Sequence, residues 1–136
     1  MKKIFFVLAL SVLTKVGYSQ QATATATVKS DYAVIEWAEQ AHDFGKIAQG
    51  VPATFEFKFT NKGKVPLILT DARPSCGCTT PDWTKTPVMP GQQGFVKATF
   101  NAAAAGGFNK TITITANVEQ GTIPLTIKGE VMAQAQ

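Results

Sequence analysis

Histidine and cysteine are scarce in this chain, and their scarcity excludes several kinds of site. The 136 residues include one histidine and two cysteines. A closed zinc site takes about four ligands, usually cysteine and histidine, and this chain cannot supply them. A nucleophile, base and acid arrangement would need His42 as its base, and the sequence places no serine and aspartate to complete it. We therefore expect no enzyme, no catalytic residues and no cofactor.

Other familiar patterns are also missing. Asp43-Phe44-Gly45 matches one element of protein kinases, but the chain lacks a glycine-rich loop, a His-Arg-Asp motif and the necessary length. His42 remains a candidate base or ligand, although a lone histidine followed by a glycine more often starts a strand or a turn. The disulfide that joins the two sheets of immunoglobulin domains needs cysteines far apart in sequence, and this chain has none.

Long apolar runs are absent beyond residue 13. The run at residues 4–13 follows a short positive start and precedes Gly17 and Ser19, which are small residues at the spacing that a signal peptidase needs. It has about half the length of a membrane-spanning helix. A lipid anchor would need a cysteine at the cleavage point, and the first cysteine is Cys76. We predict a signal peptide at residues 1–19, cleavage near Ser19, no membrane anchor, and a periplasmic or secreted protein; the alternative is a buried N-terminal strand or helix.

Basic residues exceed acidic ones mainly because of this leader. Its removal lowers the 13 basic residues to 10, against 9 acidic ones. The remaining lysines are scattered and form no stripe or cluster. We therefore expect no nucleic acid as a partner and no attraction to an anionic membrane.

The rest of the sequence is typical of short β-strands. Phe55, Phe57 and Phe59 alternate with polar residues, which predicts a strand with one buried face. Similar alternation marks two further segments, at residues 108–115 and 123–131. No window of helical length shows helical periodicity with caps. The remaining expected strands and turns are a first strand at 32–37, a turn at 61–64 leading to a strand through Leu67 and Leu69, and a turn at 90–94 before a strand at 95–100.

Seven or so short strands in about 100 residues predict an immunoglobulin-like antiparallel β-sandwich. We assign it to residues 31–131, with a flexible Ala/Thr linker at 20–30 and a frayed tail at 132–136. Its core should rest on the alternating phenylalanines, on Phe95 or Phe100, on the isoleucine and leucine positions and on one tryptophan.

Both cysteines fall in Ser75-Cys76-Gly77-Cys78-Thr79, the one stretch that suggests chemistry beyond folding. A disulfide between them would close only three residues, for which the chain-entropy model gives about 1.6 kcal/mol. So tight a ring contributes little to the stability of the fold, and its strained geometry makes it suited to reversible reduction. Two thiolates could instead bind a soft ion such as Cu(I). The pair is therefore structural, a redox disulfide or a metal site, and an exported setting favours the oxidised state.

The tryptophans are candidates for binding by stacking. Trp83 follows the cysteines in a Pro- and Thr-rich stretch that resembles a loop, so it is a possible binding residue or an anchor for that loop. Trp37 is open to the same two interpretations.

Several stretches together resemble a bacterial family, the domain-of-unknown-function 1573 family, whose members have an immunoglobulin-like fold. They are residues 42–47, 57–63, 66–68, 75–79, 89–91, 107–110 and 127–131. The resemblance implies an exported β-sandwich of no established activity. The architecture is also similar to modules related to major sperm protein, which serve mainly as binding or scaffold domains. The leader ending in Ser19-Gln20 resembles those of the Bacteroidetes group.

Two classes of function remain open. The first is a non-enzymatic protein-binding or scaffold module of the cell envelope, docking to another envelope protein through a sheet edge or a loop end. The second is a redox-active or copper-handling protein that uses Cys76 and Cys78. The oligomeric state is open in both cases.

Overall fold

The structure is a computed structural model that describes residues 31–135. The predicted signal peptide and linker lie outside these residues, as does Gln136. The described chain forms eight strands and no helix, and so contains no helix that could span a membrane. The strands are β1 (Ile35–Trp37), β2 (Ala41–Ala48), β3 (Ala53–Asn61), β4 (Leu69–Pro74), β5 (Thr79–Trp83), β6 (Gln93–Phe100), β7 (Gly106–Ala116) and β8 (Thr122–Met132).

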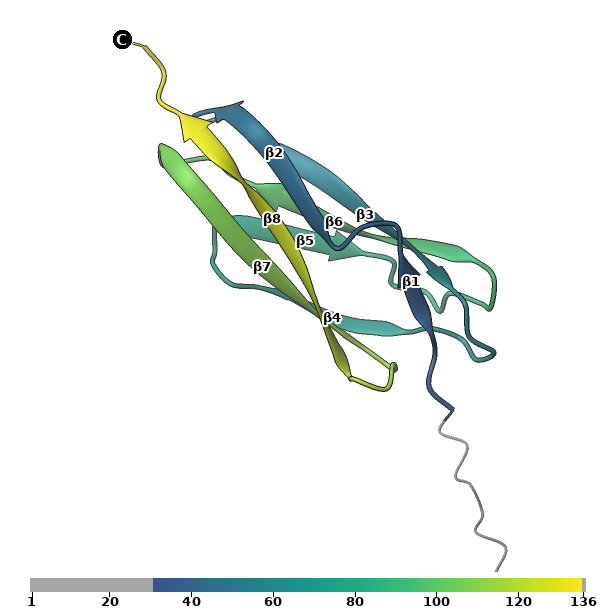
Figure 1. Ribbon diagram of the computed structural model, residues 1–136. Helices are drawn as coiled ribbons and strands as arrows, with labels where there is room; N and C mark the ends of the chain where they lie inside the picture. The colour runs from purple at the N-terminus through teal and green to yellow at the C-terminus, as the bar shows by residue number, and fades with distance from the viewer. Residues whose placement is uncertain (1–30, 136) are drawn as a thin grey trace, which may run out of the picture.

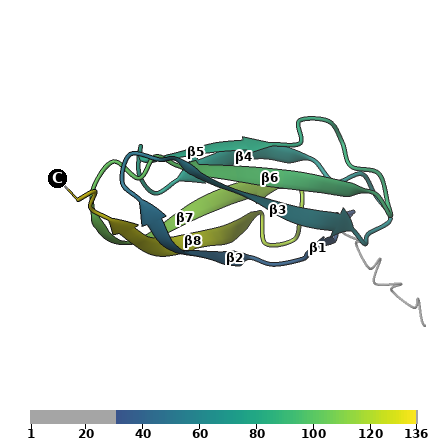
Figure 2. The same ribbon diagram turned by 90° about the horizontal axis from the view of Figure 1, so that it is seen from above.

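Two four-stranded sheets form the layers of a sandwich (Figure 1). One sheet has the order β1-β3-β6-β5 and the other has the order β2-β8-β7-β4. Seen from above, the two layers face each other along their length (Figure 2). The expectation of an immunoglobulin-like β-sandwich is confirmed, with eight strands where about seven were expected.

The N-terminal segment contributes to both sheets, which the sequence pattern did not reveal. β1 pairs antiparallel with β3, whereas β2 crosses to the other sheet and pairs parallel with β8. This parallel pair is an exception to the expected antiparallel pairing. A register shift between Asp43 and Lys46 interrupts it, and Gly45 there has φ of 64°. Such a positive φ suits glycine, which has no Cβ to clash with the backbone.

The core lies between the sheets and is supplied by the alternating positions. Phe57 and Phe59 of β3 are fully buried, and Phe55 is half-buried beside them. From the opposite sheet, β7 contributes Ile112 and Ile114, and β8 contributes three residues spaced by two: Ile123, Leu125 and Ile127. The predicted burial of the phenylalanine face is confirmed.

Several expected boundaries differ from the structure. The first strand begins at Ile35 rather than at Tyr32, and the last continues to Met132. The turn after Asn61 does not form a hairpin, because β3 and β4 belong to different sheets. Leu67 therefore precedes β4 and makes an isolated bridge with Val88.

Candidate functional site

The two cysteines lie where the chain crosses from one sheet to the other. β4 ends at Pro74 on the edge of one sheet, and β5 begins at Thr79 on the edge of the other. Ser75 still bonds to β7: its N–H donates to the Thr111 carbonyl at 2.8 Å, and its Oγ accepts from the Thr111 N–H at 3.1 Å. At the other end of the turn, the Cys78 carbonyl accepts from the Asn101 N–H at 2.9 Å. The cysteine turn is thus held to both layers of the sandwich.

Cys76 and Cys78 are joined by a disulfide. Both are half-buried, and Cys78 packs against the core, while Gly77 between them is exposed. The Cys78 N–H donates to Cys76 Sγ at 3.3 Å. In this state neither sulfur is a thiolate, so Cu(I) could bind here only after reduction. The chemistry open to the pair as it stands is thiol–disulfide exchange at an exposed turn.

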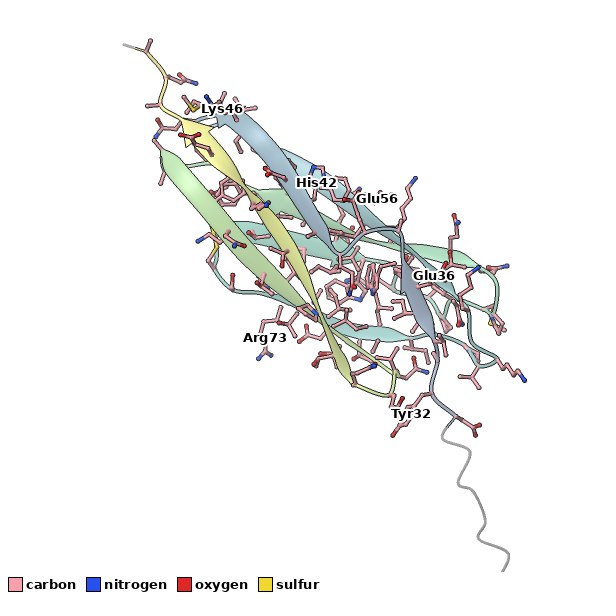
Figure 3. The ribbon with its side chains drawn as sticks, viewed as in Figure 1. Tyr32, Glu36, His42, Lys46, Glu56 and Arg73 are labelled. Carbon is pink, nitrogen blue, oxygen red and sulfur yellow. A yellow bond between two sulfur atoms is a disulfide. The ribbon has the colours of Figure 1, made fainter. Side chains whose placement is uncertain are left out.

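The cysteine turn bonds to the β6–β7 loop, and that loop is joined in turn to two further segments; together the four form what we call the disulfide end. It consists of residues 75–78, the β2–β3 turn at 49–52, the β6–β7 loop at 101–105 and the end of β8. Backbone and side-chain bonds tie these segments: Gly50 N–H to the Ala102 carbonyl, Gln49 Nε2 to the Ala103 carbonyl, and Gln49 N–H to the Met132 carbonyl, all at 2.9 to 3.1 Å. Figure 3 places Lys46 close to this end and Tyr32 at the opposite end.

The disulfide end exposes apolar side chains. Val51 is 55% exposed and Met132 is 42% exposed, and three consecutive alanines of the β6–β7 loop, at 103–105, are also exposed. Beside Cys78 lies a hollow of about 300 Å³, walled by these alanines and by Phe100 and Phe108. The rings of Phe100 and Phe108 stack with centroids 4.0 Å apart. An apolar surface of this kind often marks a site of interaction.

Trp83 lies at the end of β5 and not in a loop, which corrects our interpretation of that stretch. Its ring is half-buried against the core, and its Nε1 donates to the Leu69 carbonyl at 3.4 Å. The Lys85 ammonium lies over the ring, 2.8 Å from its centroid. The side chain therefore connects the adjacent edge strands β4 and β5. A role in binding stays a prediction.

His42 is not brought to the cysteines. Its ring stacks on Phe55 of the other sheet, with centroids 3.6 Å apart, and contacts Phe44 edge-on. Its Nδ1 lies 3.9 Å from a carboxylate oxygen of Glu39; the histidine side chain is half-buried and the glutamate is exposed. Within residues 31–135 no three His, Cys, Asp or Glu side chains gather as a metal site would need. Figure 3 shows His42 on β2 near Glu56, at the side of the sandwich.

A sequence profile described as "Protein of unknown function (DUF1573)" matches residues 35–131. The chain belongs to the DUF1573 family. This confirms the resemblance inferred from the sequence, and the matched region contains both cysteines and Trp83. No curated protein matches the chain.

Solved structures similar to this DUF1573 domain share its fold at low sequence identity. A protein of unknown function from Porphyromonas gingivalis superposes with a TM-score of 0.67 at 19% identity, covering 80% of this chain and 51% of that protein. The chain thus spans about half the length of that relative. A PapD-like domain of human CEP192 gives 0.62 at 10% identity, covering 98% and 100%. The secreted serine protease VesC from Vibrio cholerae gives 0.58 at 14%, covering 75% and 24%.

One residue beside the DUF1573 domain's disulfide end was not identified from the sequence. Lys110 lines the same hollow as Cys78 and is half-buried. It lies in phase with Ile112 and Ile114, so its side chain takes an inward-facing position of β7. The sequence does contain a signal that could have identified Lys110: a lysine stands at a position of an alternating strand where an apolar residue is expected.

Replacing both Cys76 and Cys78 by Ser should lower the free energy of unfolding by less than about 2 kcal/mol, because a three-residue ring restrains the unfolded chain only weakly. The hydrogen bonds that Ser75 and Cys78 make to β7 and β6 use atoms that the substitution leaves in place. Urea unfolding of the two proteins, followed by circular dichroism, measures the difference. A loss above about 4 kcal/mol, of the size seen on removing a long-range disulfide, would contradict the prediction.

Proposed function

We propose that this DUF1573 protein is an exported, non-enzymatic β-sandwich module that binds another protein of the cell envelope at its disulfide end. The proposal joins two parts. The leader at residues 1–19 supports export, and the apolar loop surface supports binding of a protein. Domains that carry function on loops at one end of a rigid sandwich are common.

The observation that carries the proposal is the exposure of Val51, Met132 and the alanines at 103–105 in segments that hydrogen bonds join; the alanines also line the hollow beside Cys78. Single exposed apolar residues are ordinary on a protein surface, but these come from three separate segments that hydrogen bonds hold together. The apolar surface is therefore fixed before any partner arrives, which lowers the entropy cost of binding.

A photo-crosslinking amino acid in place of Val51, in protein exported by its own host, tests the proposal. Val34 is the matched control, because it is 53% exposed and lies two residues after Tyr32, which Figure 3 places at the opposite end of the sandwich. We expect a discrete crosslinked envelope protein from position 51 and none from position 34. Equal labelling from both positions, or none from position 51, would contradict binding at the disulfide end.

Thiol–disulfide exchange is the second candidate, favoured by the exposed turn at Gly77. A thiolate of a partner protein would attack one sulfur of the pair and form a mixed disulfide, and the other cysteine would leave as a thiolate and take up a proton. The Cys76→Ser, Cys78→Ser double variant separates the candidates. It should keep the crosslink from position 51 if the module binds by its surface, and lose it if the partner is held through sulfur.

Export should remove the leader. The apolar run and the small residues that end in Ser19 motivate cleavage before Gln20. The intact mass of protein from the envelope fraction should therefore correspond to residues 20–136. Recovery of the folded protein there with Met1 still attached would refute the prediction.

A further inference from the structure

Part of β7 lacks a neighbour on one side. β8 pairs with β7 along residues 106–115, but β4 pairs only from Ile112 onward, with Ser75 extending the contact to Thr111. Beyond that point the chain turns away at Cys76 toward the other sheet. Within residues 31–135, the stretch of β7 from Gly106 to Lys110 is therefore paired with β8 alone.

The direction of the backbone groups follows from Thr111. Both its N–H and its carbonyl point toward the β4 side, since both bond to Ser75. Along a strand these directions alternate, so Asn109 and Gly107 also direct their N–H and carbonyl groups to that side. Four backbone groups thus continue the line of β4 with no strand opposite them among the described residues. An edge of this kind is a template for an added strand.

The side chains beside this edge form the hollow already described. Phe108 and Lys110 are two residues apart and both line it, together with Cys78 and the alanines at 103–105. Its lining contains one cation and no acidic residue. Lys110 is half-buried and makes no ion pair with any of the described acidic side chains. The side of the hollow that β7 forms is therefore apolar at Phe108 and positively charged at Lys110, the next inward-facing residue.

We propose that an extended segment of the partner protein adds to β7 as a short antiparallel strand in the place where β4 would have continued. The inference rests on the proposed function and names the chemistry of the partner. β4 and β8 both run antiparallel to β7, so an added strand in line with β4 takes the same direction. Residues directly opposite in such a pair share a face, and alternate residues enter the hollow.

The partner sequence follows from this register. Ser75 lies opposite Thr111 and Cys76 follows it, so the added strand begins opposite Asn109. Its second residue, opposite Phe108, enters the hollow with an acidic side chain that reaches diagonally to Lys110. Its fourth residue, opposite Gly106, enters beside the alanine wall with an apolar side chain. The residue between them pairs with Gly107 through the backbone and points to solvent. The recognised segment is thus an extended acidic-x-apolar motif.

A synthetic peptide, acetyl-Thr-Glu-Thr-Leu-Thr-amide, is the probe. Binding to the oxidised full domain is followed by titration of backbone amide resonances, with a dissociation constant of about 1 mM expected for so short a strand. The amides of Gly107 and Asn109 should shift and exchange more slowly with solvent. The peptide with Glu and Leu exchanged has the same composition, and it should bind about fivefold more weakly because the charge then lies opposite Gly106, farther from Lys110.

Two matched changes test the backbone and the charge separately. N-methylation of the middle threonine removes the donor to the Gly107 carbonyl and should weaken binding about fivefold. Lys110→Gln should also weaken it about fivefold, whereas Lys128→Gln should leave it unchanged. Lys128 lies directly opposite Asn109 on β8, is exposed and faces away from the hollow, so it controls for general charge effects.

Equal binding of the two peptide orders, or no effect of N-methylation, would overturn the added strand. Octanoate binding as tightly as the peptide would make the hollow a site for amphiphilic carboxylates instead. A dimer of the domain that dissociates on Gly107→Pro would make a second copy the occupant, and would also overturn the inference. If the peptide fails while the crosslink from position 51 persists, this inference falls and the proposed function stands. Loss of the crosslink removes both.

Discussion

The Phe57→Ala variant should lose about 3–5 kcal/mol of its free energy of unfolding, which is a large share of the total for a small domain. Phe57 has no exposed surface, pairs with Val96 across β3 and β6, and contacts Phe55 edge-on at 4.9 Å between centroids. Removing the ring leaves a cavity between the two sheets. Hydrogen bonds within each sheet hold the backbone on both sides of the cavity, so the site cannot collapse around alanine. Urea unfolding gives the value.

Glu56→Ala is the matched control because it changes the adjacent residue of the same strand on the other face. Glu56 lies opposite Lys97 and is not part of the core. Both side chains are half-buried and no ion pair within 4 Å joins them, so the carboxylate contributes little and we expect a loss of about 0.5 kcal/mol or less. Similar losses from the two substitutions would mean that the buried face of β3 has been assigned wrongly.

The Asn61→Asp variant should lose at least about 3 kcal/mol, although it changes only an amide to a carboxylate of the same shape. Asn61 is fully buried, and its Nδ2 donates to the Val65 and Val88 carbonyls, each at 2.8 Å. Its Oδ1 accepts from the Gly63 N–H at 2.9 Å. A carboxylate has no donors, so the substitution would remove the side-chain bond from both carbonyls, leave the Val88 carbonyl with the Leu67 N–H as its one donor among the described residues, and place a negative charge against them.

Asn117→Asp is the control for this prediction. Asn117 makes the same kinds of bond, with its Nδ2 donating to the Pro66 carbonyl at 2.9 Å and its Oδ1 accepting from the Ile68 N–H at 2.8 Å. These bonds are exposed, so water can replace the lost donor, and we expect a loss of about 1 kcal/mol or less. If both substitutions cost the same, burial is not what makes the Asn61 bonds important.

The two predictions concern parts of the molecule that hold the disulfide end in place from a distance. Phe57 packs in the core between the two sheets, and Asn61 ties together the loops at the opposite end of the sandwich. Neither residue belongs to the hollow beside Cys78. Milder changes at these positions should therefore alter stability while leaving the binding surface as it is.

Local alternation was sufficient to predict most strands. Much of β3, β7 and β8 presents an apolar residue at every second position, and the structure buries these apolar residues: Phe57 and Phe59, Ile112 and Ile114, and Ile123, Leu125 and Ile127. Because a strand with one buried face must alternate with a period of two, the pattern determines both the element and its face. The two cysteines are two residues apart in the sequence, so a disulfide between them was one of the predicted states, and the structure joins them.

Two strands, β2 and β5, were not predicted because their sequences do not alternate regularly. In β2 the apolar residues Phe44 and Ile47 are three apart, since the register shift at Gly45 inserts extra chain between them. β5 is a short edge strand that contains Pro81 and pairs only with β6. A bulge breaks the period of two, and an edge strand with a proline does not need one.

The sequence by itself thus determined the all-β class, the buried faces of the long strands and the family. The tertiary structure alone decided which strands share a sheet, that β2 runs parallel to β8, and that the cysteine turn leaves β7 uncovered beside Lys110. The physical reason is that alternation records only which side of a strand is buried. Its neighbours are chosen by contacts between residues far apart in the chain, and these depend on how both sheets close around one core.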